Sequence, residues 1–188
     1  MTARDATLRA ARGDDDALAE LVRAYHDRVY RFGVRVCRDA VDADDAVQEA
    51  FTKLARRPEV VRHPGALSWL MTVVRNTCRQ LLRPFARERR VLGERTEPDE
   101  EPATALDPQQ ALERWELVHA VHAAIAALDQ PSREVLVMRD LEGLSGEETC
   151  AALGLAPAAM KSRLHRARTQ LRAELGRRGM DERFSGGN

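Results

Sequence analysis

The sequence predicts an all-α protein: two small helical domains joined by a flexible linker, the C-terminal one a helix-turn-helix. Ala, Leu, Arg and Glu abound among its 188 residues, aromatic residues make up only 4%, and alternating β-branched runs are scarce. This composition favours helices over strands. Apolar residues recur at helical spacing on both sides of one acidic, proline-containing stretch. The length suits one domain or two small ones.

Several classes of protein are disfavoured by what the sequence lacks. No apolar run approaches 18 residues and the N-terminus has no apolar signal segment, so we expect a cytoplasmic protein without membrane insertion. No GxSxG motif or glycine-rich phosphate loop occurs, so we expect no catalytic residues, no cofactor and no enzyme.

Cys37, Cys78 and Cys150 form no CxxC pair; each should pack as a small apolar side chain, outside any zinc site or disulfide. His119 and His122 lack neighbouring ligands, so no metal site is expected.

The N-terminal domain, residues 1–92, is predicted to begin with two amphipathic helices. Asp14, Asp15 or Asp16 can cap the first. Its apolar stripe comprises Leu18, Leu21, Val22, Tyr25, Val29, Phe32 and Val36. The second begins near Asp42, with acidic residues that suit the N-terminal end of the helix dipole. Its stripe comprises Ala43, Val47, Ala50, Phe51 and Leu54.

A third helix follows a loop through His63, and its two faces differ in chemistry. The apolar face comprises Leu70, Val73, Val74, Thr77 and Leu81. Arg75, Arg79 and Arg83 recur every four residues on the opposite face, and no acidic residue lies between Arg62 and Arg87. A row of guanidinium groups without interleaved acids suits a phosphate backbone, although a solvated face is the alternative.

An acidic stretch separates the domains. Residues 94–113 contain seven Asp or Glu and one Arg, and 93–108 are rich in proline without apolar periodicity. We therefore expect a flexible linker at 93–108 and a disordered tail at 179–188.

The C-terminal domain, residues 109–178, is predicted to end in a helix-turn-helix. A helix over about 109–128 precedes a second one that Pro131 opens and Gly143 ends. Ser145 and Glu148 form a capping box for a short helix over 146–153. A turn at Gly154 leads to a basic helix from Pro157, the plan of a helix-turn-helix. The buried stripe of that helix comprises Met160, Leu164, Ala167, Leu171 and Leu175.

The net charge of zero is a sum of opposed blocks. Residues 1–50 carry a net charge of −3, 56–90 of +7, 94–113 of −6, and 161–178 of +6. Two arginine-dominated blocks on amphipathic helices favour a nucleic-acid partner in spite of overall neutrality.

Several motifs resemble the extracytoplasmic-function (ECF) group of bacterial RNA polymerase sigma factors. DADDAVQEAF (42–51) and ALSWLMTVVRNTCRQLLR (66–83) are similar to the region 2 of that family. LDQPSREVLVMRDLEGLSGEETCAALGL (128–155) and MKSRLHRAR (160–168) are similar to its region 4. The chain departs from the pattern at Ala156, where the family often has a Ser or Thr cap, and at Cys150, where a small aliphatic residue is usual.

The resemblance implies three binding sets. The set that would dock on the polymerase clamp helices is Asp44, Asp45, Gln48, Glu49 and Thr52. The set for the melted −10 element is Arg57, Arg62, His63, Arg75, Asn76, Arg79 and Arg83. The set for the double-stranded −35 element is Ala158, Lys161, Ser162, Arg163, His165, Arg166 and Arg168.

The implied function is promoter recognition, DNA melting and transcription initiation at a restricted promoter set. The implied partners are core RNA polymerase (clamp helices and flap), promoter DNA and a cognate anti-sigma factor. Two alternatives stay open. A stand-alone helix-turn-helix repressor or activator would bind its operator without polymerase, and a helical adaptor protein would leave both arginine rows unexplained.

Overall fold

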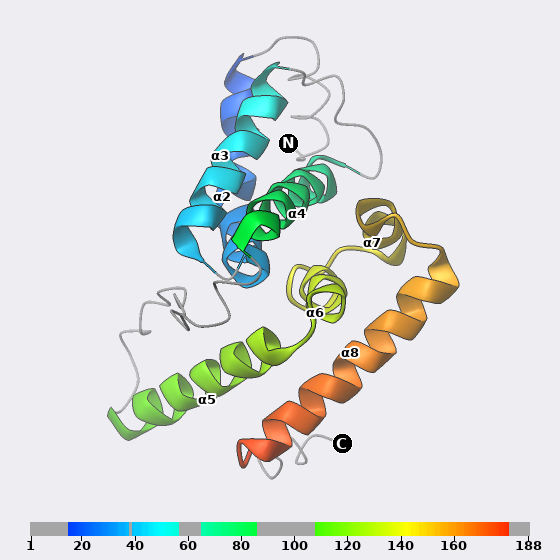
Figure 1. The fold of residues 1–188 in the computed structure, drawn as a ribbon. Helices are drawn as coiled ribbons and strands as arrows, with labels where there is room; N and C mark the ends of the chain where they lie inside the picture. The colour runs from blue at the N-terminus through cyan, green and yellow to red at the C-terminus, as the bar shows by residue number, and fades with distance from the viewer. Residues whose placement is uncertain (1–14, 38, 57–64, 86–107, 181–188) are drawn as a thin grey trace.

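The computed structural model describes residues 15–37, 39–56, 65–85 and 108–180, and all regular structure in these segments is helical. The N-terminal domain contains α2 (Asp15–Cys37), α3 (Ala40–Arg56) and α4 (Ala66–Phe85) (Figure 1). The C-terminal domain contains α5 (Pro108–Ala127), α6 (Gln130–Leu136), the π-helix η2 (Val137–Leu141), α7 (Gly146–Leu153) and α8 (Pro157–Arg177). The predicted all-α class is confirmed. Most of the predicted linker and tail lies outside the described residues.

In the N-terminal domain, α2, α3 and α4 pack against one another around the predicted apolar stripes. Gly33 of α2 permits a close approach of these helices. A Cβ atom at this position would lie 3.3 Å from the Ala43 Cβ of α3 and 3.5 Å from the Val74 Cγ1 of α4. Since 3.3 Å is tighter than an ordinary van der Waals contact, a larger residue would push the helices apart.

A disulfide joins two helices of this domain, and here the sequence-based expectation was wrong. Cys37 ends α2 and Cys78 lies in the middle of α4, with their Cα atoms 5.0 Å apart. Both side chains are fully buried. The two residues are 41 positions apart in the sequence, and the crossing of α2 and α4 brings them together. Cys150 is a free thiol that packs against the core, as expected.

In the C-terminal domain, side chains cap two helices: Asp129, which the sequence analysis did not single out, and the predicted Ser145. The Asp129 carboxylate accepts hydrogen bonds from the Ser132 backbone N–H (2.9 Å) and hydroxyl (2.8 Å) at the start of α6. Burial by itself would raise the pKa of Asp129, but the hydrogen bonds from Ser132, together with the Gln170 side chain and the Arg133 charge, lower that pKa. Ser145 and Glu148 form the predicted capping box of α7. Gly154 ends that helix with a φ of 64°.

The helix α8 begins without a side-chain cap, at Ala156, as the sequence indicates. Its predicted stripe is confirmed, because Met160, Leu164 and Ala167 are buried against the domain core. The apolar stripe of α5 is covered over only part of its length. Leu112 and Trp115 are 57% and 58% exposed, whereas the Ile125 side chain near the end of the helix is buried.

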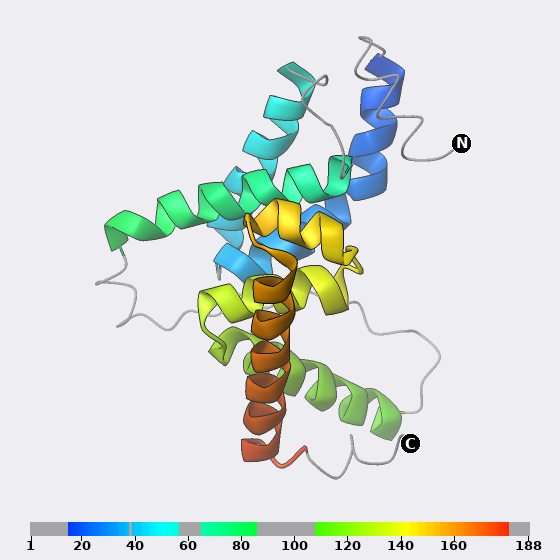
Figure 2. The ribbon, with the colours of Figure 1, turned by 90° about the vertical axis from the view of Figure 1, so that its right-hand side faces the viewer.

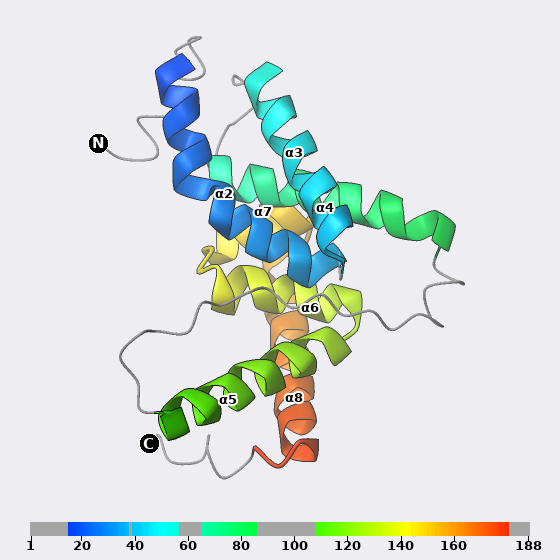
Figure 3. The ribbon, with the colours of Figure 1, turned by 90° about the vertical axis from the view of Figure 1, so that its left-hand side faces the viewer.

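The two domains pack against each other. The helix α4 contacts α7, and α2 contacts both α6 and η2. Figure 2 shows α7 lying against α4 while α8 runs away from the N-terminal domain. Figure 3 shows α6 close to α2 on the opposite side, with α5 extending away. None of the described helices is long and apolar enough to span a membrane.

Candidate nucleic-acid interface

The polar face of α3 is exposed, as predicted. Asp44, Asp45, Gln48 and Thr52 all face solvent. Glu49 is half-buried and oriented by two neighbours: the Lys53 Nζ lies 2.6 Å from its carboxylate, and the Thr77 hydroxyl of α4 donates to it at 2.9 Å. The hydrogen bonds from Lys53 and then Thr77 lower the pKa of Glu49. The result is an acidic surface with one carboxylate fixed in direction.

The predicted arginine row on α4 is not open to solvent along its length. Asn76 is exposed, but Arg75 is only 8% exposed and Arg79 is half-buried. The backbone of Arg83 belongs to α4, and its side chain lies outside the description. Arg57, Arg62 and His63 lie outside the described residues. The alternative interpretation of this row, a solvated face, therefore does not describe Arg75 in this structure.

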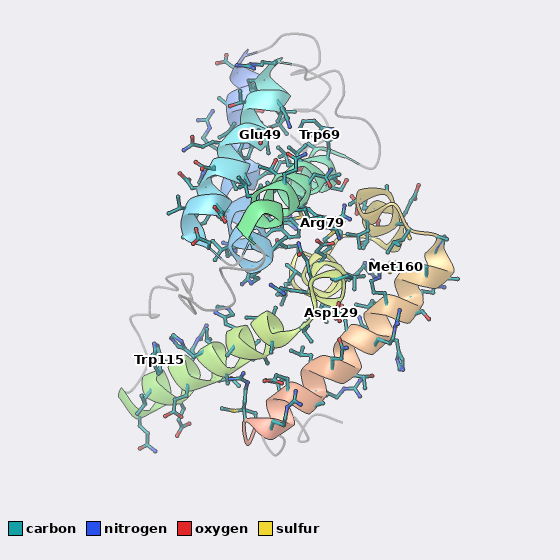
Figure 4. The ribbon with its side chains drawn as sticks, in the orientation of Figure 1. Glu49, Trp69, Arg79, Trp115, Asp129 and Met160 are labelled. Atoms are coloured by element: carbon teal, nitrogen blue, oxygen red, sulfur yellow. A yellow bond between two sulfur atoms is a disulfide. The ribbon has the colours of Figure 1, made fainter. Side chains whose placement is uncertain are left out.

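A glutamate of the C-terminal domain binds the arginine side chains of α4. Glu134 of α6 is fully buried, and its carboxylate accepts hydrogen bonds from the Arg75 Nε (2.8 Å), the Arg79 Nε (3.0 Å) and the Arg79 Nη2 (2.9 Å). The Gln130 side chain donates to it at 3.2 Å. Figure 4 shows Arg79 pointing from α4 towards α6. One carboxylate thus neutralises part of the charge of two arginines.

Arg75 also reaches the end of α7. Its Nη1 donates to the Ala152 carbonyl at 3.3 Å and to the Asn76 side chain at 3.3 Å. Ala152 lies in the last turn of α7, where unpaired carbonyls carry the negative end of the helix dipole. The Arg75 guanidinium is therefore held by two separate elements of the C-terminal domain.

A second glutamate repeats this arrangement on α2. The Glu142 side chain is buried, and its carboxylate lies 3.4 Å from the Arg28 Nε and 3.7 Å from the Arg35 Nη1. Arg28 also donates through Nη2 to the Glu142 carbonyl. In addition, Arg133 donates to the Arg35 carbonyl at 3.5 Å. Sequence reasoning missed both glutamates, because no local pattern connects either of them with arginines so far away in the sequence.

The basic face of α8 is open, in contrast to that of α4. Ala158, Lys161, Ser162, His165 and Arg166 are exposed, and Arg163 is half-buried. These residues lie in the first turns of the second helix of a helix-turn-helix, the part that reaches base edges in the major groove of DNA. Among the described residues, no cluster of three His, Cys, Asp or Glu side chains could hold a metal ion.

Arg168 differs from the other predicted contacts of α8. Its Nε and Nη2 donate to the two carboxylate oxygens of Asp140 in η2, at 2.8 and 2.6 Å. The hydrogen bonds that Arg168 donates to the Asp140 carboxylate raise the pKa of Arg168. A bidentate pair of this kind fixes the direction of the guanidinium. In this structure Arg168 therefore connects α8 to η2.

Known proteins match both domains. Models of sigma-70 region 2 and sigma-70 region 4 match residues 21–88 and 119–171. The ECF sigma factor SigE of Mycolicibacterium smegmatis is 36% identical over 167 residues, which cover 86% of this chain and 64% of SigE. SigM of Mycobacterium tuberculosis is 34% identical over 175 residues, covering 92% of this chain and 85% of SigM. The solved structure of CnrH, in complex with the cytosolic domain of CnrY, matches with a TM-score of 0.66 at 26% identity, covering 93% and 98% of the two chains.

Two helical domains that match regions 2 and 4 in this order define the class, which is the sigma-70 family of RNA polymerase subunits. Within this class, the identity to SigM over most of both chains shows that this chain belongs to the ECF group of RNA polymerase sigma factors. The chain spans 64% of the length of SigE.

Proposed function

We propose that this chain directs core RNA polymerase to a restricted set of promoters and supports DNA melting and transcription initiation there. It acts as a specificity subunit, and the core polymerase supplies the catalysis. The observation that carries the proposal is the exposed basic face at the start of α8, on a helix-turn-helix of the ECF family. In this role Lys161, Ser162 and Arg166 would contact the −35 element.

The N-terminal domain would supply the remaining contacts. The acidic face of α3, with Glu49 held in position by Lys53 and Thr77, suits docking on the clamp helices of polymerase. The arginine row of α4 and residues 57–64 would bind the melted −10 element. Residues 1–92 and 109–178 would then correspond to regions 2 and 4, with 93–108 as the linker. CnrH was solved in complex with the cytosolic domain of CnrY, and the sigma factor RpoE of Bartonella quintana in complex with the anti-sigma factor NepR. We therefore include an anti-sigma factor among the proposed partners.

Transcription in vitro tests the proposal. Core polymerase with and without the chain is given genomic DNA of the encoding organism, and the 5′ ends of the transcripts are sequenced. The chain should produce transcripts from a limited promoter set that core polymerase alone does not make. The double variant Lys161→Ala, Arg166→Ala should lower this output roughly tenfold or more, because each good base contact contributes about 1–3 kcal/mol. Arg114→Ala, an exposed arginine of α5, is the control and should have no effect.

Two results would contradict the proposal. One is an unchanged promoter set on addition of the chain. The other is a sequence-specific footprint by the chain alone at the concentration that fails to stimulate core polymerase, which would identify a stand-alone repressor or activator instead.

A further inference from the structure

Thr77 is the one residue on the predicted apolar face of α4 that carries a polar side-chain atom. The other members of this face are Leu70, Val73, Val74 and Leu81. Thr77 is only 7% exposed, and a buried hydroxyl needs a hydrogen-bond partner, because leaving it unpaired is costly. Valine has nearly the same shape and would fill this position without that requirement. The hydroxyl therefore has a role that packing does not explain.

The partner of this hydroxyl lies on another helix. Within a helix, a threonine hydroxyl can donate to the carbonyl four residues earlier, and Thr72 of α4 does so, to Ser68 at 2.7 Å. Thr77 instead donates to the Glu49 carboxylate of α3 at 2.9 Å. Glu49 lies where α3 runs alongside α4 (Figure 4). The hydrogen bond thus connects the helix of the proposed −10 contacts to the helix of the proposed polymerase contacts.

The Glu49 carboxylate is held at both of its oxygens. Thr77 donates to Oε2, and the Lys53 Nζ, one turn further along α3, lies 2.6 Å from Oε1. The hydrogen bonds from Lys53 and then Thr77 favour the ionised form, so they lower the pKa of Glu49. The Glu49 side chain is still 41% exposed, and each carboxylate oxygen can accept more than one hydrogen bond. Glu49 is therefore a charged acceptor with a fixed direction that remains partly open to a partner.

Thr77 is the more rigid of the two donors. Lys53 reaches Glu49 through a long, flexible side chain that is half-exposed. The short, β-branched side chain of Thr77 has little rotational freedom in a helix. Its neighbours on α4 are fixed as well, because Val74 is buried in the core one turn earlier and Cys78 is joined to α2 by the disulfide. The direction of the carboxylate therefore depends on the placement of α4.

We propose that Thr77 is a positioning residue for polymerase docking, whose hydroxyl holds the Glu49 carboxylate in the direction in which core polymerase binds it. The inference rests on the proposed function, because it concerns the polymerase contacts of α3. Ordering a flexible side chain before binding removes part of the entropy cost of ordering it in the complex. Thr77 acts through Glu49 and is itself almost fully buried.

Binding to core polymerase tests the inference. The full-length chain carries a fluorescent label at its amino terminus, and its dissociation constant for core polymerase is measured by anisotropy. Thr77→Val removes the hydroxyl and keeps the shape of the side chain, whereas Thr77→Ser keeps a hydroxyl. Thr72→Val is the matched control, because it makes the same change on the same helix at a hydroxyl that bonds within α4. Circular dichroism checks that each variant is folded.

We expect Thr77→Val to bind core polymerase about fivefold more weakly than the unaltered chain. Thr77→Ser should keep most of the affinity, and Thr72→Val should not change it. In a Glu49→Ala background, Thr77→Val should have no further effect, because the hydroxyl acts through Glu49. The pKa of Glu49, followed by carbon NMR of its carboxyl group, should rise in Thr77→Val and stay in place in the other two, since only Thr77→Val loses a hydrogen bond to the ionised form.

The inference is wrong if Thr77→Val binds core polymerase as tightly as the unaltered chain, even where the pKa of Glu49 rises, because polymerase then makes no use of the fixed carboxylate. It is also wrong if Thr77→Val weakens binding equally with and without the Glu49 side chain, which would indicate a role in packing alone. A failure of the proposed function gives a different result. In that case the unaltered chain itself does not bind core polymerase, and the inference falls with the proposed function.

Discussion

The helices α4 and α8 carry similar rows of basic side chains, but the row on α4 is partly buried and the row on α8 is exposed. On α4, Arg75 and Arg79 bind a buried glutamate from the other domain. On α8, Lys161 and Arg166 face solvent. The spacing of charges along a helix therefore indicates which face they share, and it does not indicate whether water, nucleic acid or another part of the chain covers that face.

The helices also differ in how they are anchored. A disulfide joins α4 to α2 within the N-terminal domain. The helix α8 is held by apolar packing of Met160, Leu164 and Ala167, and by the pair between Arg168 and Asp140. The covered row thus sits on a covalently anchored helix, and the open row sits on a helix held by non-covalent contacts. Three measurements test these differences in exposure and anchoring between α4 and α8.

The largest effect should come from reduction of the disulfide. Closing a loop of 41 residues corresponds to about 4 kcal/mol of stability in the chain-entropy model. Dithiothreitol should therefore lower the urea midpoint of the N-terminal domain, measured by Trp69 fluorescence in a Trp115→Phe background. Trp69 is a partly buried residue of α4 packed on the core, so it reports on this domain.

The control is Cys150→Ser, which should respond to dithiothreitol in the same way because Cys150 is a free thiol. Thiol titration of the denatured, unreduced chain should find one reactive group. Three reactive groups, or unfolding curves that dithiothreitol does not move, would show that α4 has no covalent anchor.

A smaller difference should separate Arg75→Ala from Arg166→Ala. Loss of Arg75 leaves the buried Glu134 with Arg79 and Gln130 as donors, and loss of one partner from a buried ion pair is costly. We expect a cost of about 2 kcal/mol in the free energy of unfolding. Loss of the exposed Arg166 should change it by less than about 0.5 kcal/mol. Urea unfolding followed by circular dichroism measures both, and equal costs would mean that the two rows do not differ energetically.

Much of the fold was predictable because its determinants are local. The apolar stripes of α2, α3, α4 and α8 follow from helical periodicity, and all of their described residues are buried or partly buried. The capping box of Ser145 and Glu148, and the turn at Gly154, depend on a few adjacent residues. These interactions form within one or two helical turns, so a pattern in the sequence is sufficient to identify them.

The main unpredicted features depend on how distant segments are placed relative to one another. Arg75 and Glu134 are 59 positions apart in the sequence, and no local pattern marks Glu134 as the partner of Arg75. The same holds for the pairing of Cys37 with Cys78, and for the exposure of Trp115 at the uncovered end of α5. Of the candidate site, the exposed faces of α3 and α8 could be predicted, whereas the cover over α4 could not.

The smallest effect concerns Arg168, the residue of α8 whose charge is already paired. An exposed ion pair contributes about 0–1 kcal/mol, so Arg168→Ala should weaken promoter binding by a small factor. If the pair with Asp140 positions α8, Asp140→Asn should weaken promoter binding as well, and the double variant should be no weaker than either single one. If Arg168 instead serves as a phosphate contact, Asp140→Asn frees its guanidinium and strengthens binding. A double-mutant cycle on promoter affinity, measured with polymerase holoenzyme, distinguishes the positioning role from the phosphate contact. Residues that act through a shared interaction show a coupling energy, whereas the effects of independent residues on the binding free energy add.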